Sequence, residues 1–127
     1  MKRKGRSPTS RSLEYCDEKL GWIAGVVERR IPYKFITIDL FGCIDIVAIA
    51  GDRIIGIQAT SDDNHASRRT KALAEPRLRA WLAAGGGFEV WSWGKKGAAG
   101  KRKLWTLRRE QLELKMLPQV VPASEAA

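Results

Sequence analysis

Residues 39–60 constrain the fold of this chain more than any other segment. They form two apolar runs separated by Gly51-Asp52, and a glycine in the first position of a two-residue turn is typical of a β-hairpin with a type II′ turn. Pairing outward from this turn places Asp45 directly opposite Gln58. A three-residue turn would instead shift the register of the two strands.

Polar residues interrupt these apolar strands at positions that share one face. Thr60 follows Gln58 by two residues, and the side chains of a strand return to the same face at every second residue. Residues directly opposite each other have Cβ atoms about 5 Å apart, so Asp45, Gln58 and Thr60 form one polar patch. Burying such groups without partners is unfavourable by roughly 2–7 kcal/mol, which suggests a functional site. The alternative is a fully hydrogen-bonded polar cluster within a half-buried sheet.

The pattern Ile44-Asp45 followed by Gln58-Ala59-Thr60 resembles the motif of the PD-(D/E)XK nuclease superfamily. In that family an Asp opens one strand of a hairpin, and an acidic residue and a Lys lie two positions apart on the next strand. Residues 57–61 also match an Ile-Gln-x-Thr-Ser variant of small phage and bacterial proteins that resemble Holliday-junction resolvases. Here Gln58 replaces the carboxylate and Thr60 replaces the Lys. The resemblance extends over roughly residues 11–110.

The resemblance implies an α/β fold with a restriction-endonuclease-like mixed sheet flanked by helices, and an activity that depends on Mg²⁺ or Mn²⁺. It implies that Asp45, Gln58 and the backbone carbonyl of Ala59 bind the metal. It also implies a carboxylate on the preceding helix, which Glu14 matches. Alternatively, Glu14 is a solvated acid that interacts favourably with the dipole of that helix. The implied catalytic residues are Glu14, Asp45, Gln58 and Thr60.

Compared with the family motif, these residues lack one carboxylate and the ammonium group of the Lys. Asp45 and Gln58 carry one formal negative charge where two carboxylates would carry two, and Thr60 cannot replace the ammonium group of a Lys. Arg68 or Lys71, on the helix that follows the hairpin, could reach back and supply a cation.

Two other polar residues near the motif have simpler interpretations. Asp39 is interpreted as a turn residue rather than as a group that supports Asp45. His65 is interpreted as a surface or capping residue of the next helix rather than as a base that activates water.

An excess of cationic residues indicates the class of partner. The chain has 23 Lys and Arg residues against 14 Asp and Glu residues, which gives a net charge of +9. This charge favours nucleic acid over a membrane surface or an acidic protein, although a merely basic protein would share it. A Gly-rich basic loop at 94–103 is expected to contact the DNA backbone. Its cations are Lys95, Lys96, Lys101, Arg102 and Lys103.

Length and composition favour one domain. We expect a disordered basic arm at 1–9, a single nuclease-like domain at 10–117 and a flexible tail at 118–127. Cys16 and Cys43 lie in apolar segments and are interpreted as core residues. No apolar run reaches the roughly 18 residues of a membrane span, and no signal peptide is recognisable, so we expect a cytoplasmic protein.

The expected order of elements is α-β-β-β-α-β-β. A helix begins near Ser10 or Ser12, three strands follow, and an irregular crossing occurs around Pro32 within this part. A helix or helix pair and two further strands complete a mixed sheet with helices packed against it. The strands are expected at 22–28, 43–50, 53–60, 88–93 and 103–107.

Three functions are consistent with the sequence. The first is a metal-dependent DNA endonuclease or resolvase-like phosphodiester hydrolase, which would act on branched or structured DNA. The second is a catalytically inactive nucleic-acid-binding protein of the same fold, and the third is a basic assembly or adaptor protein. Cleavage of both DNA strands needs two sites, so the first function also suggests a homodimer.

Overall fold

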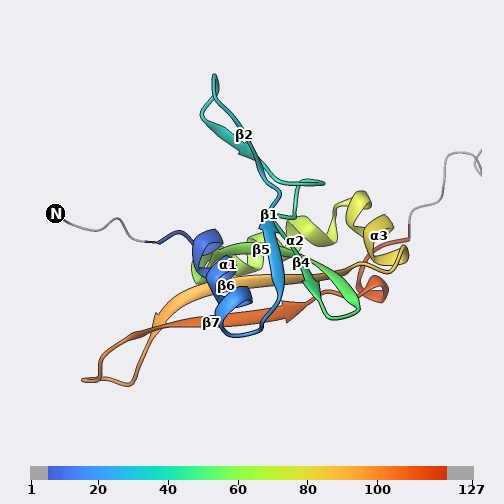
Figure 1. Ribbon diagram of the computed structural model, residues 1–127. Coiled ribbons are helices and arrows are strands. Elements are labelled where there is room, and N and C mark those ends of the chain that lie inside the picture. Colours follow the sequence, from blue (N-terminus) through green and yellow to red (C-terminus); the bar gives the residue numbers. More distant parts are fainter. Residues whose placement is uncertain (1–5, 120–127) are drawn as a thin grey trace, which may run out of the picture.

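A five-stranded mixed sheet forms the centre of the structure, a computed structural model in which residues 6–119 are described (Figure 1). Neighbouring strands are antiparallel except for β5 and β6, which are parallel. A parallel pair needs a crossover connection, and two helices, α2 and α3, supply it. In spatial order the strands are β1 (Ile23–Val26), β4 (Ile46–Ala50), β5 (Arg53–Ser61), β6 (Gly87–Lys96) and β7 (Leu104–Gln111).

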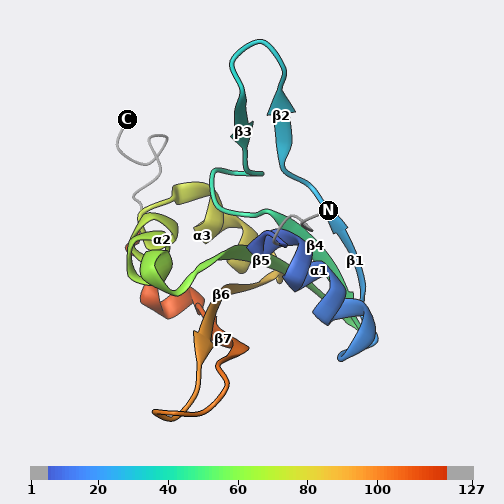
Figure 2. The ribbon, with the colours of Figure 1, turned by 90° about the vertical axis from the view of Figure 1, so that its left-hand side faces the viewer.

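The helices pack on both faces of this sheet (Figure 2). Helix α1 (Pro8–Glu18) covers one face, and α2 (His65–Leu73) and α3 (Pro76–Ala83) cover the other. Short 3-10 helices, Asp62–Asn64 and Leu114–Met116, precede α2 and follow β7. The result is a three-layer mixed α/β domain. No helix within residues 6–119 is long and apolar enough to cross a membrane.

Successive residues of β5 face opposite sides of the sheet, and each side packs into a separate core. Ile55 and Ile57 face α1 and pack with Cys16 and Trp91. Gly56, between them in sequence, lies against Ile44 in the core beneath α2 and α3. The period of two that separates these side chains is the one expected for a strand buried on both faces.

The two free cysteines are buried in these cores, which confirms their interpretation as core residues. Burial raises the pKa of Cys16 to about 11 and the pKa of Cys43 to about 12. Both thiols therefore stay protonated at neutral pH.

Side-chain caps and a proline determine where α1 and α3 begin. Ser7 accepts a hydrogen bond from the Ser10 N–H (3.1 Å) and caps α1 three residues before the first expected cap. The helix pair expected after the hairpin is confirmed. Its break comes at Pro76, which lacks a backbone N–H to continue α2, and Glu75 caps the new helix by accepting from the Arg77 N–H.

The register expected for the central hairpin is confirmed. Residues 46–50 of β4 pair with residues 53–57 of β5 around Gly51-Asp52, and Gly51 adopts a φ of +68°. However, β4 starts at Ile46 rather than at residue 43. The Asp45 N–H donates to the carbonyl of Ile57 (2.9 Å), the residue that also pairs with Ile46. Two residues thus face one, which is the arrangement of a β-bulge and bends the strand out of the sheet.

The segment around Pro32 differs from the irregular crossing expected there. Strands β2 (Arg29–Ile31) and β3 (Ile36–Ile38) pair with each other as a separate two-stranded sheet. This hairpin projects away from the body of the domain (Figures 1 and 2). Strand propensity does not indicate which strands pair, so it could not predict that these two strands pair only with each other.

Two other expected segments also need correction, and a third lies largely outside the described residues. Residues 8 and 9 belong to α1 rather than to a disordered arm, and residues 1–5 lie outside the described part. Of the expected tail, 120–127 likewise lie outside it. Strand β6 extends to Lys96, because Lys95 and Lys96 pair with Trp105 and Leu104 of β7. The basic loop is therefore shorter than expected.

Gly56→Ala should reduce the free energy of unfolding by about 1–3 kcal/mol, because the core beside it is already filled. A Cβ at this position would lie 2.7 Å from Cδ1 of the buried Ile44. Ile44→Val removes that methyl group and should restore part of the loss in the double variant. Gly25→Ala in β1 is the matched control, because its Cβ would meet no atom within 4 Å. Urea denaturation of the wild type, the three single variants and the double variant measures these differences. A neutral Gly56→Ala would contradict the packing described here.

Candidate functional site

Three acidic residues meet where β4 leaves the sheet. Asp45 occupies the bulge, and its carbonyl accepts a hydrogen bond from the Val27 N–H (2.8 Å), which holds the following residue, Glu28, beside it. Asp39 directly follows β3, and the next residue, Leu40, donates to the carbonyl of Ile44 (2.9 Å). Carboxylate oxygens of Glu28, Asp39 and Asp45 all lie within 4.8 Å of one another. Backbone pairing at the base of the projecting hairpin thus assembles the acidic cluster.

Gln58 links the hairpin strands at this cluster. Its Nε2 donates to Asp45 Oδ2 (2.7 Å) and, at a longer 3.4 Å, to Asp39 Oδ2. The Ala59 N–H donates to the same oxygen of Asp45 at 2.8 Å. The expected contact between Asp45 and Gln58 is therefore confirmed, although Asp45 reaches it from a bulge rather than from a regular ladder position.

The carbonyl oxygen of the Gln58 side chain is buried and accepts no hydrogen bond from residues 6–119. The side chain is 2% exposed, so solvent does not satisfy this oxygen freely. A buried acceptor without a donor costs about 1–3 kcal/mol. The amide therefore stabilises the carboxylates with its nitrogen while its oxygen lacks a hydrogen-bond donor.

The environment of Asp45 favours its protonated form. Burial raises the pKa of Asp45 to about 8, and a hydrogen bond with Asp39 and the charge of Asp39 add to this effect. The Ala59 N–H acts in the opposite direction because it stabilises the carboxylate. Burial, followed by the charge of Asp39, also raises the pKa of Glu28. In the absence of a cation, burial and mutual repulsion therefore both favour the protonated forms of Asp45 and Glu28.

A hollow of about 390 Å³ opens onto this cluster. Its lining includes the three carboxylates together with Gln58 and Ala59. Arg68 and Lys71, from successive turns of α2, also line the hollow. The helix that follows the hairpin thus places two cationic residues at the same hollow as the acids.

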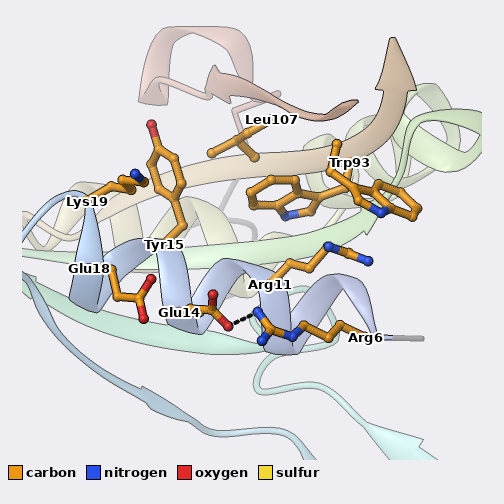
Figure 3. A pocket seen from close by; sticks show the side chains of 9 residues that line it. Arg6, Arg11, Glu14, Tyr15, Glu18, Lys19, Trp93 and Leu107 are labelled. Atoms are coloured by element: carbon orange, nitrogen blue, oxygen red, sulfur yellow. Dashed lines mark hydrogen bonds and ion pairs between the residues drawn. The ribbon is translucent and has the colours of Figure 1, made fainter. Parts of the chain in front are cut away.

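Two expected site residues do not line this hollow. Thr60 is buried and pairs in register with Ser92 of β6. Glu14 lies in a different hollow, between α1 and the β6–β7 hairpin, where its carboxylate pairs with Arg6 (Figure 3). Trp93 and Leu107 line the other side of that hollow (Figure 3). The structure therefore does not support the expected roles of Glu14 and Thr60 beside Asp45.

His65 differs from both of its interpretations. It is buried, and its ring nitrogens contact Ser92 Oγ (2.7 Å) and Glu110 Oε1 (2.8 Å). Arg69 donates to the other oxygen of Glu110 (2.7 Å). These bonds fasten the start of α2 to β6 and β7. None of these four residues lines the hollow, so His65 orients the helix that carries Arg68 and Lys71.

Glu28 and Asp39 are the site residues that sequence reasoning missed or set aside. Asp39 was interpreted as a turn residue, and Glu28 was placed at the end of a strand. Their one shared signal is that they flank a segment rich in strand-forming and basic residues, Arg29–Ile38. Recognising that segment as a hairpin would bring its two ends, and hence the two acids, together.

The donor set fits a hard divalent cation. Mg²⁺ prefers oxygen ligands, and carboxylates of Asp39, Asp45 and Glu28 are available in the hollow. A half-turn of the Gln58 amide would exchange Nε2 for the unpartnered oxygen. Ala59 directs its N–H at Asp45, and the N–H and C=O of one residue in an extended strand point to the same side, so its carbonyl faces this edge too.

The loop cations lie elsewhere on the surface. All five cations are exposed. Lys95 and Lys96 lie at the end of β6, and the other three, Lys101, Arg102 and Lys103, lie in the loop that joins β6 to β7. Lys96 lies 3.7 Å from Asp62, and Lys95 lies over the ring of Trp105. This hairpin and the β2–β3 hairpin project from different sides of the body (Figure 2).

No protein-family model, curated protein or solved structure matches this chain.

Asp45 should make the stability of the protein fall as pH rises. The unfolded chain releases this proton near pH 4, whereas the folded protein holds it until about pH 8. Between these values the unfolded state binds fewer protons, so the free energy of unfolding should fall by up to about 1.4 kcal/mol per pH unit. Asp45→Asn should remove most of this slope. Urea denaturation between pH 5 and pH 8, with no divalent cation present, measures it.

Asp17→Asn provides the control for this experiment, because it removes an exposed carboxylate on α1. It should retain the wild-type slope. Equal slopes in the wild type and Asp45→Asn would show that burial does not hold a proton on Asp45.

Proposed function

We propose that this protein is a metal-dependent DNA endonuclease with a restriction-endonuclease-like fold. The observation that carries the proposal is the hollow in which three carboxylates, an unpartnered amide oxygen and two cations converge. The carboxylates and the amide suit a divalent cation, and the cations suit a phosphate. This combination is the one that hydrolysis of a phosphodiester requires.

The arrangement of elements supports the same proposal. When the projecting β2–β3 hairpin is set aside, the chain runs α1, β1, β4, β5, α2–α3, β6, β7. This is the order of elements expected from the sequence, and the motif residues fall at the β4–β5 pair as the resemblance implies. A β-bulge beside the motif is also typical of strands that position a functional side chain.

The carboxylates of Glu28 and Asp39 would remedy the charge deficit of the motif. Asp45 and Gln58 alone offer one negative charge, whereas the cluster offers up to three once Asp45 loses its proton. Bound Mg²⁺ would lower the pKa of an attacking water and polarise the phosphoryl group. Asp39, Asp45, Gln58 Oε1 and the Ala59 carbonyl would hold it. The release of the Asp45 proton makes this binding stronger as pH rises.

Arg68 and Lys71 would bind the phosphate group of the substrate. Both lie on α2 and line the same hollow as the carboxylates. A phosphodiester placed between the two groups would have its negative charge balanced on one side and its reactive phosphorus near the carboxylates on the other. In this arrangement α2 supplies the positive charge that position 60 lacks.

One observation favours a catalytically inactive DNA-binding protein instead. The Gln58 Nε2 already bonds Asp45 and Asp39, so the cluster is stabilised without a cation. Burial keeps Asp45 protonated at neutral pH, which weakens its competition for Mg²⁺. The net charge of +9 serves DNA binding equally well in either case.

Asp45→Asn should abolish cleavage while the protein remains folded, because the amide preserves the size of the side chain and removes its ability to bind a cation as a carboxylate. The assay measures cleavage of linear, nicked and four-way-junction DNA with Mg²⁺ and with Mn²⁺, at pH 7 and pH 8.5. The wild type should cleave faster at the higher pH. Asp17→Asn is the matched control and should retain activity. Absence of wild-type cleavage on every substrate would reject the nuclease proposal in favour of the inactive one.

Gln58→Glu should tighten Mg²⁺ binding, because a carboxylate holds a hard cation better than an amide does. Without metal the variant should be less stable than the wild type at neutral pH, since a further carboxylate joins Asp39 and Asp45. Thermal melts of both proteins with and without Mg²⁺ measure the two effects. A loss of melting temperature that Mg²⁺ does not reverse would show that Gln58 is a structural hydrogen-bond partner only.

Neutralising the exposed cations of the β6–β7 hairpin should weaken DNA binding about equally for all sequences. Contacts to phosphate release counterions, so the variant should also show a shallower dependence of affinity on salt. The variant replaces Lys95, Lys96, Lys101, Arg102 and Lys103 with Gln. Fluorescence anisotropy with labelled duplex at several salt concentrations measures both quantities. Unchanged affinity would remove this hairpin from the DNA-binding surface.

A further inference from the structure

The β2–β3 hairpin is a ribbon without support from the rest of the domain. Its strands form their own two-stranded sheet, and the ribbon stands clear of the body in both views (Figures 1 and 2). An isolated two-stranded hairpin is marginally stable in water, and three or more strands or a packed helix are normally needed. A partner that contacts the ribbon would therefore stabilise it.

Aromatic side chains occupy the tip of this ribbon. Tyr33 is 94% exposed and Phe35 is 82% exposed, although rings of this kind usually contribute to a core. Phe35 also adopts a φ of 50°, in the left-handed region that residues with a bulky side chain rarely occupy. Pro32 lies in the same turn and stiffens it. The tip thus presents flat apolar groups to the outside from a restrained backbone.

The charge of the ribbon has one sign. Arg29, Arg30 and Lys34 are exposed, and residues 29–38 include no Asp or Glu. Among residues 6–119, none of the ion pairs involves these three cations. They are therefore free to contact an anionic partner along the length of the ribbon.

The base of the ribbon is the acidic cluster itself. Glu28 directly precedes β2 and Asp39 directly follows β3. A DNA strand whose phosphate enters the hollow would therefore lie beside the base of the ribbon, because Thr37 and Ile38 of β3 also line the hollow. This placement connects the ribbon to the site proposed above.

From these observations we infer that the β2–β3 hairpin is a DNA-contacting arm whose aromatic tip stacks on bases exposed by branched or distorted DNA. The inference rests on the proposed function for the meaning of the nearby hollow. Its cations contact phosphates, and its rings find a partner only where bases are unpaired or easily unstacked. Apolar residues on proteins that bend or open DNA insert between bases in this way.

Charge argues against a second copy of the chain as the partner of this ribbon. Two ribbons related by a two-fold axis would bring Arg29, Arg30 and Lys34 of each copy together with no acid on either ribbon to balance them. The chain as a whole carries +9, which adds to this repulsion. DNA offers both phosphates for the cations and planar bases for the rings.

The test compares the double variant Tyr33→Ala, Phe35→Ala with the wild type on two DNAs of equal length, a regular duplex and a four-way junction. Affinity is measured by fluorescence anisotropy in EDTA, so that cleavage does not occur. Stacking contributes about 1–3 kcal/mol per base, so junction affinity should fall roughly tenfold or more while duplex affinity changes little. The exposed positions of both rings favour retention of the fold, which circular dichroism and thermal melts check.

A second double variant, Tyr33→Phe, Phe35→Tyr, keeps both rings and should keep the preference for the junction. Equal losses on duplex and junction, or no loss, would overturn the inference. Conversion of a wild-type dimer to a monomer by the alanine variant, measured by light scattering, would also overturn it and assign the ribbon to self-association. Because binding is measured without metal, failure of the nuclease proposal would appear separately, as absence of cleavage by the wild type with Mg²⁺ or Mn²⁺.

Discussion

The burial of the Asp45 carboxyl group beside two other acids is the constraint on which the site depends. Such a group must be protonated, hydrogen-bonded or bound to a cation, because an unpaired charge in the interior is strongly unfavourable. The protein meets this requirement with the Gln58 amide and the Ala59 N–H. Both donors come from β5. The antiparallel pairing of β4 with β5 therefore brings to Asp45 the hydrogen bonds that allow it to lie beside two other acids.

The rest of the fold holds this pairing in place. Two separate cores cover the faces of the sheet, and β5 lies at its centre with a neighbour on each side. The buried contacts of His65 with Ser92 and Glu110 fix the start of α2 against the far strands. In this way, contacts with β6 and β7 position the helix that carries Arg68 and Lys71, and backbone bonds of the segments after β1 and before β4 position the acids.

Local patterns were sufficient to predict the hairpin but not the complete site. Gly51 and the alternation of apolar residues fixed the β4–β5 register, because a one-residue slip would move every side chain to the other face. Glu14 was placed at the site by its position in a motif, yet the rotation of α1 about its axis is set by packing of Cys16 against the sheet. Glu28 reaches the site through the backbone bond of Val27 to Asp45, a residue far along the chain, which no short window contains. Asp39 reaches it because β3 pairs with β2 and returns the chain to the same place.

The two ends of the β2–β3 ribbon have a mechanical consequence. Asp45 is fixed to the central sheet by hydrogen bonds from β5, whereas Glu28 and Asp39 are the residues through which the ribbon joins the domain. The backbone bonds of Val27 to Asp45 and of Leu40 to Ile44 tie both ends of the ribbon to the segment that carries Asp45. The ribbon and the acids therefore share their backbone supports, so a substitution that breaks either bond would displace the ribbon and the acidic cluster together.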